Sequence, residues 1–165
     1  MTLTSEISTM VKDVIATLAS HNQTLATAES VTAGGLSSAI TSVEGSSQIF
    51  LGGIVAYQDN VKAKVLGVDQ KIIDQHTVYS QEVALAMAKA VRDKFGSTWA
   101  IATTGVAGPG PADGVAAGTV WVVIDGPVTQ SLELSLSGGR ESVRNATVAT
   151  AIGSFTRILR GENSK

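Results

Sequence analysis

The fold is decided by residues 26–40, which read ATAESVTAGGLSSAI. Small apolar residues run into a Glu-Ser pair, and a Thr and two glycines then lead into a segment with helical character. A chain that leaves a strand through such a turn and enters a helix gathers free backbone N–H groups, which suit an anion or a developing oxyanion. The turn therefore holds a phosphate, carries a nucleophile or only connects two elements, and the residues alone leave these alternatives open.

Helical patterns lie on both sides of this unit. Residues 3–18 place apolar side chains at helical spacing along one face. Residues 81–95 follow Ser80, a good N-cap, and end against Gly96, which is typical of a helix C-terminus. Further helices are predicted at residues 34–43, 60–68 and 70–76, and from Arg140 onward.

Short apolar runs bounded by turn residues predict the strands. They lie at residues 24–29, 52–58, 98–105, 119–125 and 130–137. The chain has no internal repeat and no low-complexity linker. We therefore expect one α/β domain over residues 1–165, a layered α/β/α sandwich with a mixed sheet.

Composition excludes several classes of site. A chain of 165 residues that is 44% hydrophobic can bury a core without metal or disulfide staples. It has no cysteine, and His21 and His76 show no metal-binding spacing, so we expect no thiol nucleophile, no metal and no cofactor. A net charge of -2 without a basic face argues against nucleic-acid binding. No apolar run approaches a membrane span, so we expect a cytoplasmic protein without a membrane partner.

Hydroxyls and glycines concentrate in three loops, which read ESVTAGG, EGSSQIF and TTGVAGPGP. In the second loop, Ser46 and Ser47 can cap the following short helix or project from its first turn. Tyr57 and Lys62 follow shortly afterwards in YQDNVK. A lysine that loses its proton through burial can act as general base toward a serine, without a histidine. The competing interpretation is that the serines only cap helices and the lysine is solvated.

The loop motifs resemble the CinA C-terminal domain family, whose characterised members include nicotinamide-nucleotide amidohydrolases. The resemblance covers roughly residues 8 to 160 and keeps the order of the motifs. It rests on TAESVTAGG, VEGSSQIFLGGIVAYQDNVKAKVLGV, TTGVAGPGP with GTVW, and SGGRESVR.

The resemblance implies an enzyme that hydrolyses the carboxamide of nicotinamide mononucleotide to nicotinic acid mononucleotide and ammonia. It implies Ser47 as nucleophile and Tyr57 with Lys62 as the proton-transfer pair, while Ser30, at a strand end, is the rival nucleophile. The implied substrate-binding residues are Ser30, Thr32, Gly34, Ser46, Thr104, Gly105, Arg140 and Arg144. The two arginines are candidates for the phosphate, with Arg144 preferred.

The sequence departs from the family pattern at a few positions. Val31 and Ala33 stand where the family usually has Cys and Gly, Gly139 replaces the usual Asp, and the loop GVAAG lacks a common Lys-Pro. The chain resembles the stand-alone form of the family, and we expect a homo-oligomer. Two alternatives stay open: a nucleotide-binding module without catalysis, and an accessory protein of DNA uptake or repair.

Overall fold

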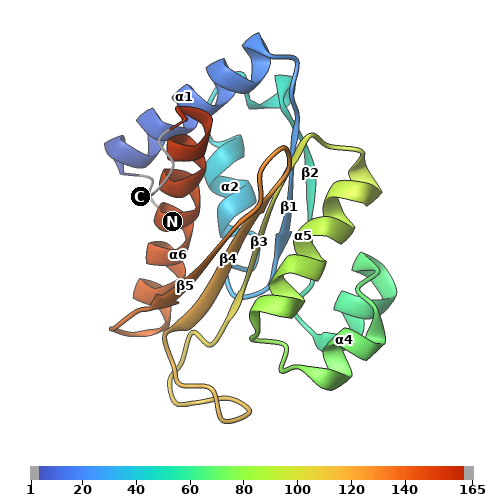
Figure 1. Ribbon diagram of the computed structural model, residues 1–165. Helices are drawn as coiled ribbons and strands as arrows, with labels where there is room; N and C mark the ends of the chain where they lie inside the picture. Colours follow the sequence, from blue (N-terminus) through green and yellow to red (C-terminus); the bar gives the residue numbers. More distant parts are fainter. Residues whose placement is uncertain (1–3, 162–165) are drawn as a thin grey trace.

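The expected succession of helices and strands is found in the computed structural model, which describes residues 4–161 (Figure 1). The helices are α1 (Ser5–Ser20), α2 (Gly35–Thr41), α3 (Asp59–Val61), α4 (Gln70–Gln75), α5 (Gln81–Phe95) and α6 (Arg140–Leu159). The strands are β1 (Leu25–Glu29), β2 (Phe50–Val55), β3 (Trp99–Gly105), β4 (Thr119–Asp125) and β5 (Gln130–Ser135). A 3₁₀ turn, η1 (Ser46–Gln48), and a π-helical turn, η2 (Lys62–Leu66), complete the chain.

The strands form one sheet in the order β2-β1-β3-β4-β5. β1 pairs in parallel with β2 and β3, whereas β4 is antiparallel to both β3 and β5. One face of the sheet is covered by α1, α2 and α6, and the other by α4 and α5 (Figure 1). β1 and β3 are buried along their whole length, as strands covered on both faces should be. The predicted α/β/α sandwich with a mixed sheet is confirmed.

Local capping signals set the ends of the long helices. Thr4 Oγ1 accepts a hydrogen bond from the N–H of Ile7 at 3.3 Å and begins α1. Ser80 Oγ accepts from the N–H of Val83 at 3.2 Å, and Gly96 ends α5 in the left-handed region with φ 64°. The predicted caps of α5 are confirmed. Residue 3, where the sequence pattern begins the first helix, lies outside the described residues.

Two of the predicted elements differ most from the structure, in extent or type. The strand predicted at residues 52–58 is β2, which begins at Phe50 and ends at Val55, because β1, its partner in the sheet, ends at Glu29. The N–H of Ala56 makes a last hydrogen bond to the carbonyl oxygen of Glu29, at 2.8 Å. The single helix predicted at residues 60–68 is instead α3 followed by η2. The carbonyl of Lys62 accepts from N–H groups five and six residues later, at 3.1 and 2.9 Å, which widens this turn.

Different loops and helix ends lie at the two ends of the parallel strands. The parallel strands β1, β2 and β3 all end at one edge, where α6 also begins, and we call this the carboxyl edge. The opposite edge carries η1, whose following residue Ile49 accepts from the N–H of Leu25 at the start of β1, at 2.8 Å. Loops at the carboxyl ends of parallel strands are the usual place for ligands in open α/β sheets. Within the described chain, none of the helices combines the length and the apolarity that a membrane span requires.

Candidate functional site

The loop after β1 is organised by the carboxylate of Glu29, the last residue of the strand, which is fully buried. Its oxygens accept from Thr32 Oγ1 (2.6 Å), the N–H groups of Gly34 (3.0 Å), Leu36 (2.9 Å) and Ser37 (2.8 Å), and Ser37 Oγ (2.5 Å). The N–H groups at the start of α2 are therefore taken by a side chain of the protein. This carboxylate occupies the place that an external phosphate would need at the turn.

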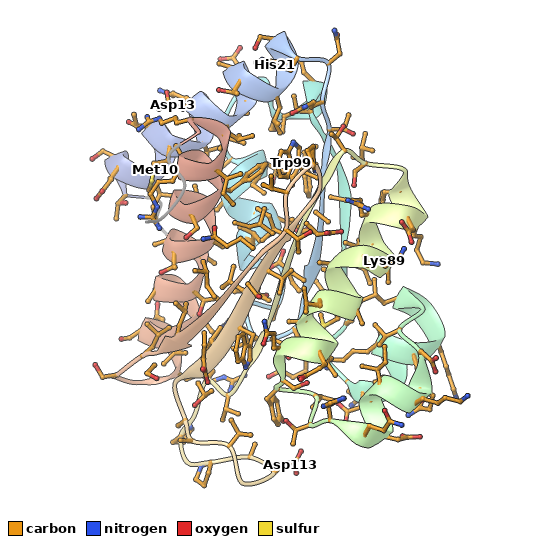
Figure 2. All side chains as sticks on the ribbon, viewed as in Figure 1. Met10, Asp13, His21, Lys89, Trp99 and Asp113 are labelled. Carbon is orange, nitrogen blue, oxygen red and sulfur yellow. The ribbon has the colours of Figure 1, made fainter. Side chains whose placement is uncertain are left out.

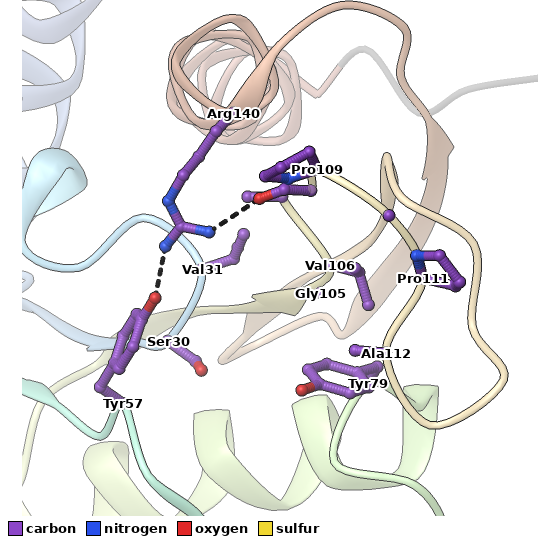
Figure 3. A pocket seen from close by; sticks show the side chains of 13 residues that line it. Ser30, Val31, Tyr57, Tyr79, Gly105, Val106, Pro109, Pro111, Ala112 and Arg140 are labelled. Carbon is purple, nitrogen blue, oxygen red and sulfur yellow. Dashed lines mark hydrogen bonds between the residues drawn. The ribbon is translucent and has the colours of Figure 1, made fainter.

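Ser30 follows Glu29 directly and opens into a cleft at the carboxyl edge (Figure 3). Ser30 is 5% exposed, and its N–H donates to the carbonyl oxygen of Thr103 at 2.9 Å, which fixes it to β3. The cleft has a volume of about 210 Å³. Its walls are Ser30, Val31, Tyr57, Tyr79, Arg140 and the glycine and proline loop at residues 105–112. Ser30 thus presents a hydroxyl between the two tyrosines.

Arg140 closes one side of this cleft by joining separate segments of the chain. Its Nη1 donates to the carbonyl oxygen of Gly108 at 3.1 Å, and its Nη2 donates to the phenol oxygen of Tyr57 (Figure 3). One side chain therefore links the residues after β2, the glycine and proline loop and the start of α6. Because the Tyr57 oxygen accepts from a cation, the phenol proton stays free to be donated to a ligand.

Lys62 is buried beside the backbone of Tyr57 and does not itself line the cleft. It is 1% exposed, with its Nζ 3.4 Å from the carbonyl oxygen of Tyr57 and 3.7 Å from Oδ1 of Asp59. Burial lowers the pKa of the Lys62 ammonium below its ordinary value of 10.5, while the charge and hydrogen bond of Asp59 oppose the shift. An amine in this position loses its proton more easily than a surface lysine does.

The structure does not bring Ser46 and Ser47 into this cleft. Both lie in η1, which precedes β2, whereas Tyr57 and Lys62 follow the other end of that strand. The six residues of β2 span roughly 20 Å, and proton transfer needs a heavy-atom distance of about 3 Å. At the edge of the sheet opposite the carboxyl edge, Ser47 is exposed and Ser46 is buried. The geometry therefore separates both serines from the proton-transfer pair with which the sequence motifs grouped them.

Thr104 and Gly105, which end β3, have different environments. Gly105 lines the cleft, and a Cβ there would lie 2.5 Å from the carbonyl oxygen of Thr119, so only glycine fits. Thr104 is buried and donates from Oγ1 to the carbonyl oxygen of Val78 at 2.6 Å. This bond ties β3 to the segment before α5 and places Tyr79 on the cleft wall. Tyr79 is a cleft residue that the sequence motifs did not single out.

A second cleft, of about 390 Å³, adjoins the first across Arg140, which lines both. It is lined by Thr32, Gly35, Arg140, Glu141, Arg144, Asn145 and Val148. Arg144 Nη2 donates to the carbonyl oxygen of Thr32 at 3.0 Å, and within residues 4–161 its buried Nε has no hydrogen-bond partner. Gly34, expected to bind substrate, lines neither of these two clefts and instead donates its N–H to Glu29.

The histidines lie away from both clefts. His21 caps the end of α1, at the far end of the molecule from Asp113 in the glycine and proline loop (Figure 2). His76 lies beyond α4, with its Nδ1 3.7 Å from the carboxylate of Glu82. Over residues 4–161, His, Asp and Glu side chains form no group of three that could hold a metal ion.

Comparisons with known proteins agree on one family. The model of the CinA C-terminal domain matches residues 7–159. A CinA-like protein from Frankia casuarinae is 41% identical over 151 residues, which cover 90% of this chain and 34% of that protein. A CinA-like protein from a Synechococcus strain is 43% identical over 143 residues, which cover 84% of this chain and 34% of that protein.

The fold is found in solved structures of the same family. The competence/damage inducible protein CihA from Agrobacterium tumefaciens has a TM-score of 0.90 at 28% identity, over 97% of this chain and 99% of that one. A competence-damaged protein (CinA) superfamily protein from Enterobacter cloacae has a TM-score of 0.89 at 30% identity, over 96% and 94%. The chain spans about a third of the length of the curated relatives it matches. With the family model matching nearly the whole described chain and these relatives covering most of it, the chain belongs to the CinA C-terminal domain family.

Proposed function

We propose that this protein hydrolyses the carboxamide of nicotinamide mononucleotide to nicotinic acid mononucleotide and ammonia, with Ser30 as the nucleophile. The observation that carries the proposal is the placement of Ser30 in a cleft beside Tyr57, whose carbonyl oxygen contacts the buried amine of Lys62. Family membership supports the choice of substrate, because the family motifs resemble those of nicotinamide-nucleotide amidohydrolases.

In the first half-reaction, the Oγ of Ser30 attacks the carboxamide carbon, and the neutral amine of Lys62 accepts the hydroxyl proton, directly or through Tyr57. The lowered pKa of Lys62 favours this step, because it raises the fraction of neutral amine. The backbone N–H groups of Val31, Ala107, Gly108 and Gly110, which line the cleft, are candidates for binding the oxyanion, each donor contributing roughly 3 kcal/mol.

The intermediate then collapses with loss of ammonia. The carbon–nitrogen bond breaks, and the leaving nitrogen takes the proton that Lys62 had accepted, with Tyr57 as the relay nearest to the cleft. In the second half-reaction, water gives a proton to Lys62 and attacks the Ser30 ester. Ser30 recovers its proton and the carboxylic acid is released, so the sum is one amide and one water converted to one acid and one ammonia.

The second cleft offers a place for the phosphate. Arg140 and Arg144 lie four residues apart on α6 and both line it. A guanidinium can bind a phosphate through two parallel hydrogen bonds, the strongest contact that a side chain offers an anion. Arg140 is already engaged by Tyr57 and Gly108, so we assign the phosphate to Arg144.

A cytoplasmic homo-oligomer is part of the same proposal. β2 is an edge strand, and apolar side chains at Leu51 and Val55, together with Val65 in η2, are about half exposed. Apolar surface along a sheet edge is a common site of association between chains. Light scattering at micromolar concentration tests this part, and a monomeric mass would contradict it.

The central experiment measures ammonia release from nicotinamide mononucleotide by the wild type, Ser30→Ala and Ser47→Ala. We expect Ser30→Ala to lose at least about 10³-fold in kcat and Ser47→Ala to stay near the wild type. Ser47 is the matched control, since it is exposed at the opposite edge of the sheet. Loss of activity in Ser47→Ala alone would refute Ser30 as nucleophile. Nucleotide binding without ammonia release would favour the non-catalytic binding module.

A further inference from the structure

Tyr79 lies on the wall of the cleft that contains Ser30, between two residues that are anchored by hydrogen bonds. On one side, the carbonyl of its neighbour Val78 accepts a buried hydrogen bond from Thr104 at 2.6 Å. On the other side, Ser80 caps α5. These contacts position the backbone of Tyr79 at the cleft.

Two tyrosine rings therefore flank the same hydroxyl. Figure 3 shows Tyr57 and Tyr79 on opposite sides of Ser30, with the ring of Tyr79 beside Ala112 of the glycine and proline loop. A planar group whose amide reaches Ser30 would therefore have a tyrosine on either side. The aromatic face is the natural partner of such a group.

The charges around Tyr79 are negative on its own side of the cleft. Burial raises the pKa of the Tyr79 phenol above 10.0, and Asp113, Asp59 and Tyr57 raise it further. The Asp113 and Asp59 carboxylates are exposed, and Asp59 also faces the buried Lys62. The guanidinium of Arg140 stands on the far side of the cleft, against Tyr57.

The cleft thus has an aromatic end at Tyr79 and, beyond Arg140, a cationic end at Arg144. We infer that Tyr79 is a specificity-determining residue that selects a substrate whose planar ring carries a positive charge and whose tail carries a negative one. This inference rests on the proposed function and names the residue that favours the positively charged pyridinium ring of the substrate over a neutral ring. A cation over a tyrosine face gains an attraction that a neutral ring of the same shape does not.

The test compares two ligands that share the amide, the ribose and the phosphate but differ in ring charge. These are nicotinamide mononucleotide, with a cationic ring, and its reduced dihydro form, with a neutral ring. Their dissociation constants are measured by calorimetry on the Ser30→Ala protein, which the proposed mechanism leaves without turnover. We expect the cationic ligand to bind about 3- to 30-fold more tightly.

Three variants in the same background identify the source of the preference. Tyr79→Phe keeps the ring face and should keep the preference, whereas Tyr79→Leu should lose most of it. Asp113→Asn removes an exposed charge and should reduce the preference without changing the fold. Thermal unfolding of each variant checks that the fold is intact.

Equal affinity for both ligands, or a full preference in Tyr79→Leu, would overturn the inference. The proposed function fails separately, if the wild type releases no ammonia from nicotinamide mononucleotide. A charge preference in the absence of ammonia release would therefore support the binding inference and refute only the reaction.

Discussion

The guanidinium of Arg140 donates a hydrogen bond to the phenol oxygen of Tyr57, a residue 83 positions earlier in the sequence. The contact crosses from the start of α6 to the end of the edge strand, and it sets which way the phenol proton can point. A tyrosine whose oxygen is held by a cation is oriented before a ligand arrives, as the proposed proton-transfer role of Tyr57 would require.

Arg140 and Tyr57 should therefore act as a unit in catalysis. We expect Arg140→Ala and Tyr57→Phe each to lower kcat, and the double variant to lose less than the product of the two single losses, with a coupling energy of about 0.5–3 kcal/mol. The measurement is a double-mutant cycle on kcat/KM for ammonia release. Strictly additive losses would show that the hydrogen bond does not serve catalysis.

Arg144 should contribute to binding rather than to the chemical step, because it lies in the second cleft, away from Ser30. We expect Arg144→Ala to raise KM for nicotinamide mononucleotide with little change in kcat, since uniform binding energy is lost. The check is the ratio of rates on the nucleotide and on its dephosphorylated riboside. If the wild type does not prefer the nucleotide, or Arg144→Ala keeps the full preference, Arg144 does not bind the phosphate.

The burial of Lys62 should lower the free energy of unfolding, although the proposed reaction needs its amine. Its pKa is lower in the folded chain, so between that value and 10.5 the unfolded chain binds more protons, and wild-type stability rises with pH. We expect Lys62→Met to release no ammonia, and to have a free energy of unfolding at neutral pH that is unchanged or up to about 3 kcal/mol higher. Urea unfolding at neutral pH and at about pH 10 measures whether the difference in free energy of unfolding between Lys62→Met and the wild type becomes smaller at high pH.

The matched control for Lys62→Met is Lys64→Met, an exposed lysine in the same turn, which should change neither activity nor the pH dependence of stability. A large loss of stability in Lys62→Met at neutral pH would mean that the ammonium is stabilising and therefore charged.

Glu29 should be needed for the shape of the loop that carries Ser30. In Glu29→Gln, an amide NH₂ would face N–H donors at the start of α2, and each buried donor left without an acceptor costs about 1–3 kcal/mol. We expect a loss of about 3 kcal/mol in the free energy of unfolding and a lower kcat. Denaturant unfolding measures the first and ammonia release the second. The exposed Glu44→Gln is the control, and equal behaviour of both variants would contradict the role assigned to Glu29.

Ala33 should be slightly strained. It is exposed and has φ 48°, in the left-handed region that favours glycine, where the family usually has that residue. We expect Ala33→Gly to raise the free energy of unfolding by about 0.5–1 kcal/mol, because relief of strain exceeds the added chain entropy. Ala116→Gly, also exposed but without a positive φ, should be slightly destabilising. Thermal unfolding compares the two, and a lower midpoint for Ala33→Gly would show that no strain is present.

The elements that the sequence predicted correctly are those fixed by local signals. Ser80 and Gly96 bound α5 through contacts within a few residues, so the pattern and the structure agree. The extent of β2 depends on where its partner strand β1 ends, at Glu29, and the turn after β2 buries Lys62 against the rest of the protein. These are tertiary contacts that no window of sequence contains.

The position of Ser47 follows from the order of the elements along the chain. Ser47 precedes a strand whereas Ser30 and Tyr57 follow strands, and in a parallel sheet this order alone places them at opposite edges. Tyr79 had no comparable signal, because it precedes a helix and reaches the cleft only through the bond between Thr104 and Val78. The motifs contain most of the side chains that line the cleft. Which of them lie together is decided by the topology of the sheet.

The length of α6 also has a consequence for how a partner can pack against the protein. The helix begins at Arg140 in the cleft and runs for 20 residues, so its last turn lies about 30 Å away along the axis. There it packs beside α1, where Arg160 pairs with Asp13, so the first and the last helix of the described chain lie side by side (Figure 1). A partner that packs against this flank would therefore contact the end of α6 that lies farthest from the cleft, and it would leave the mouth of the cleft open to solvent.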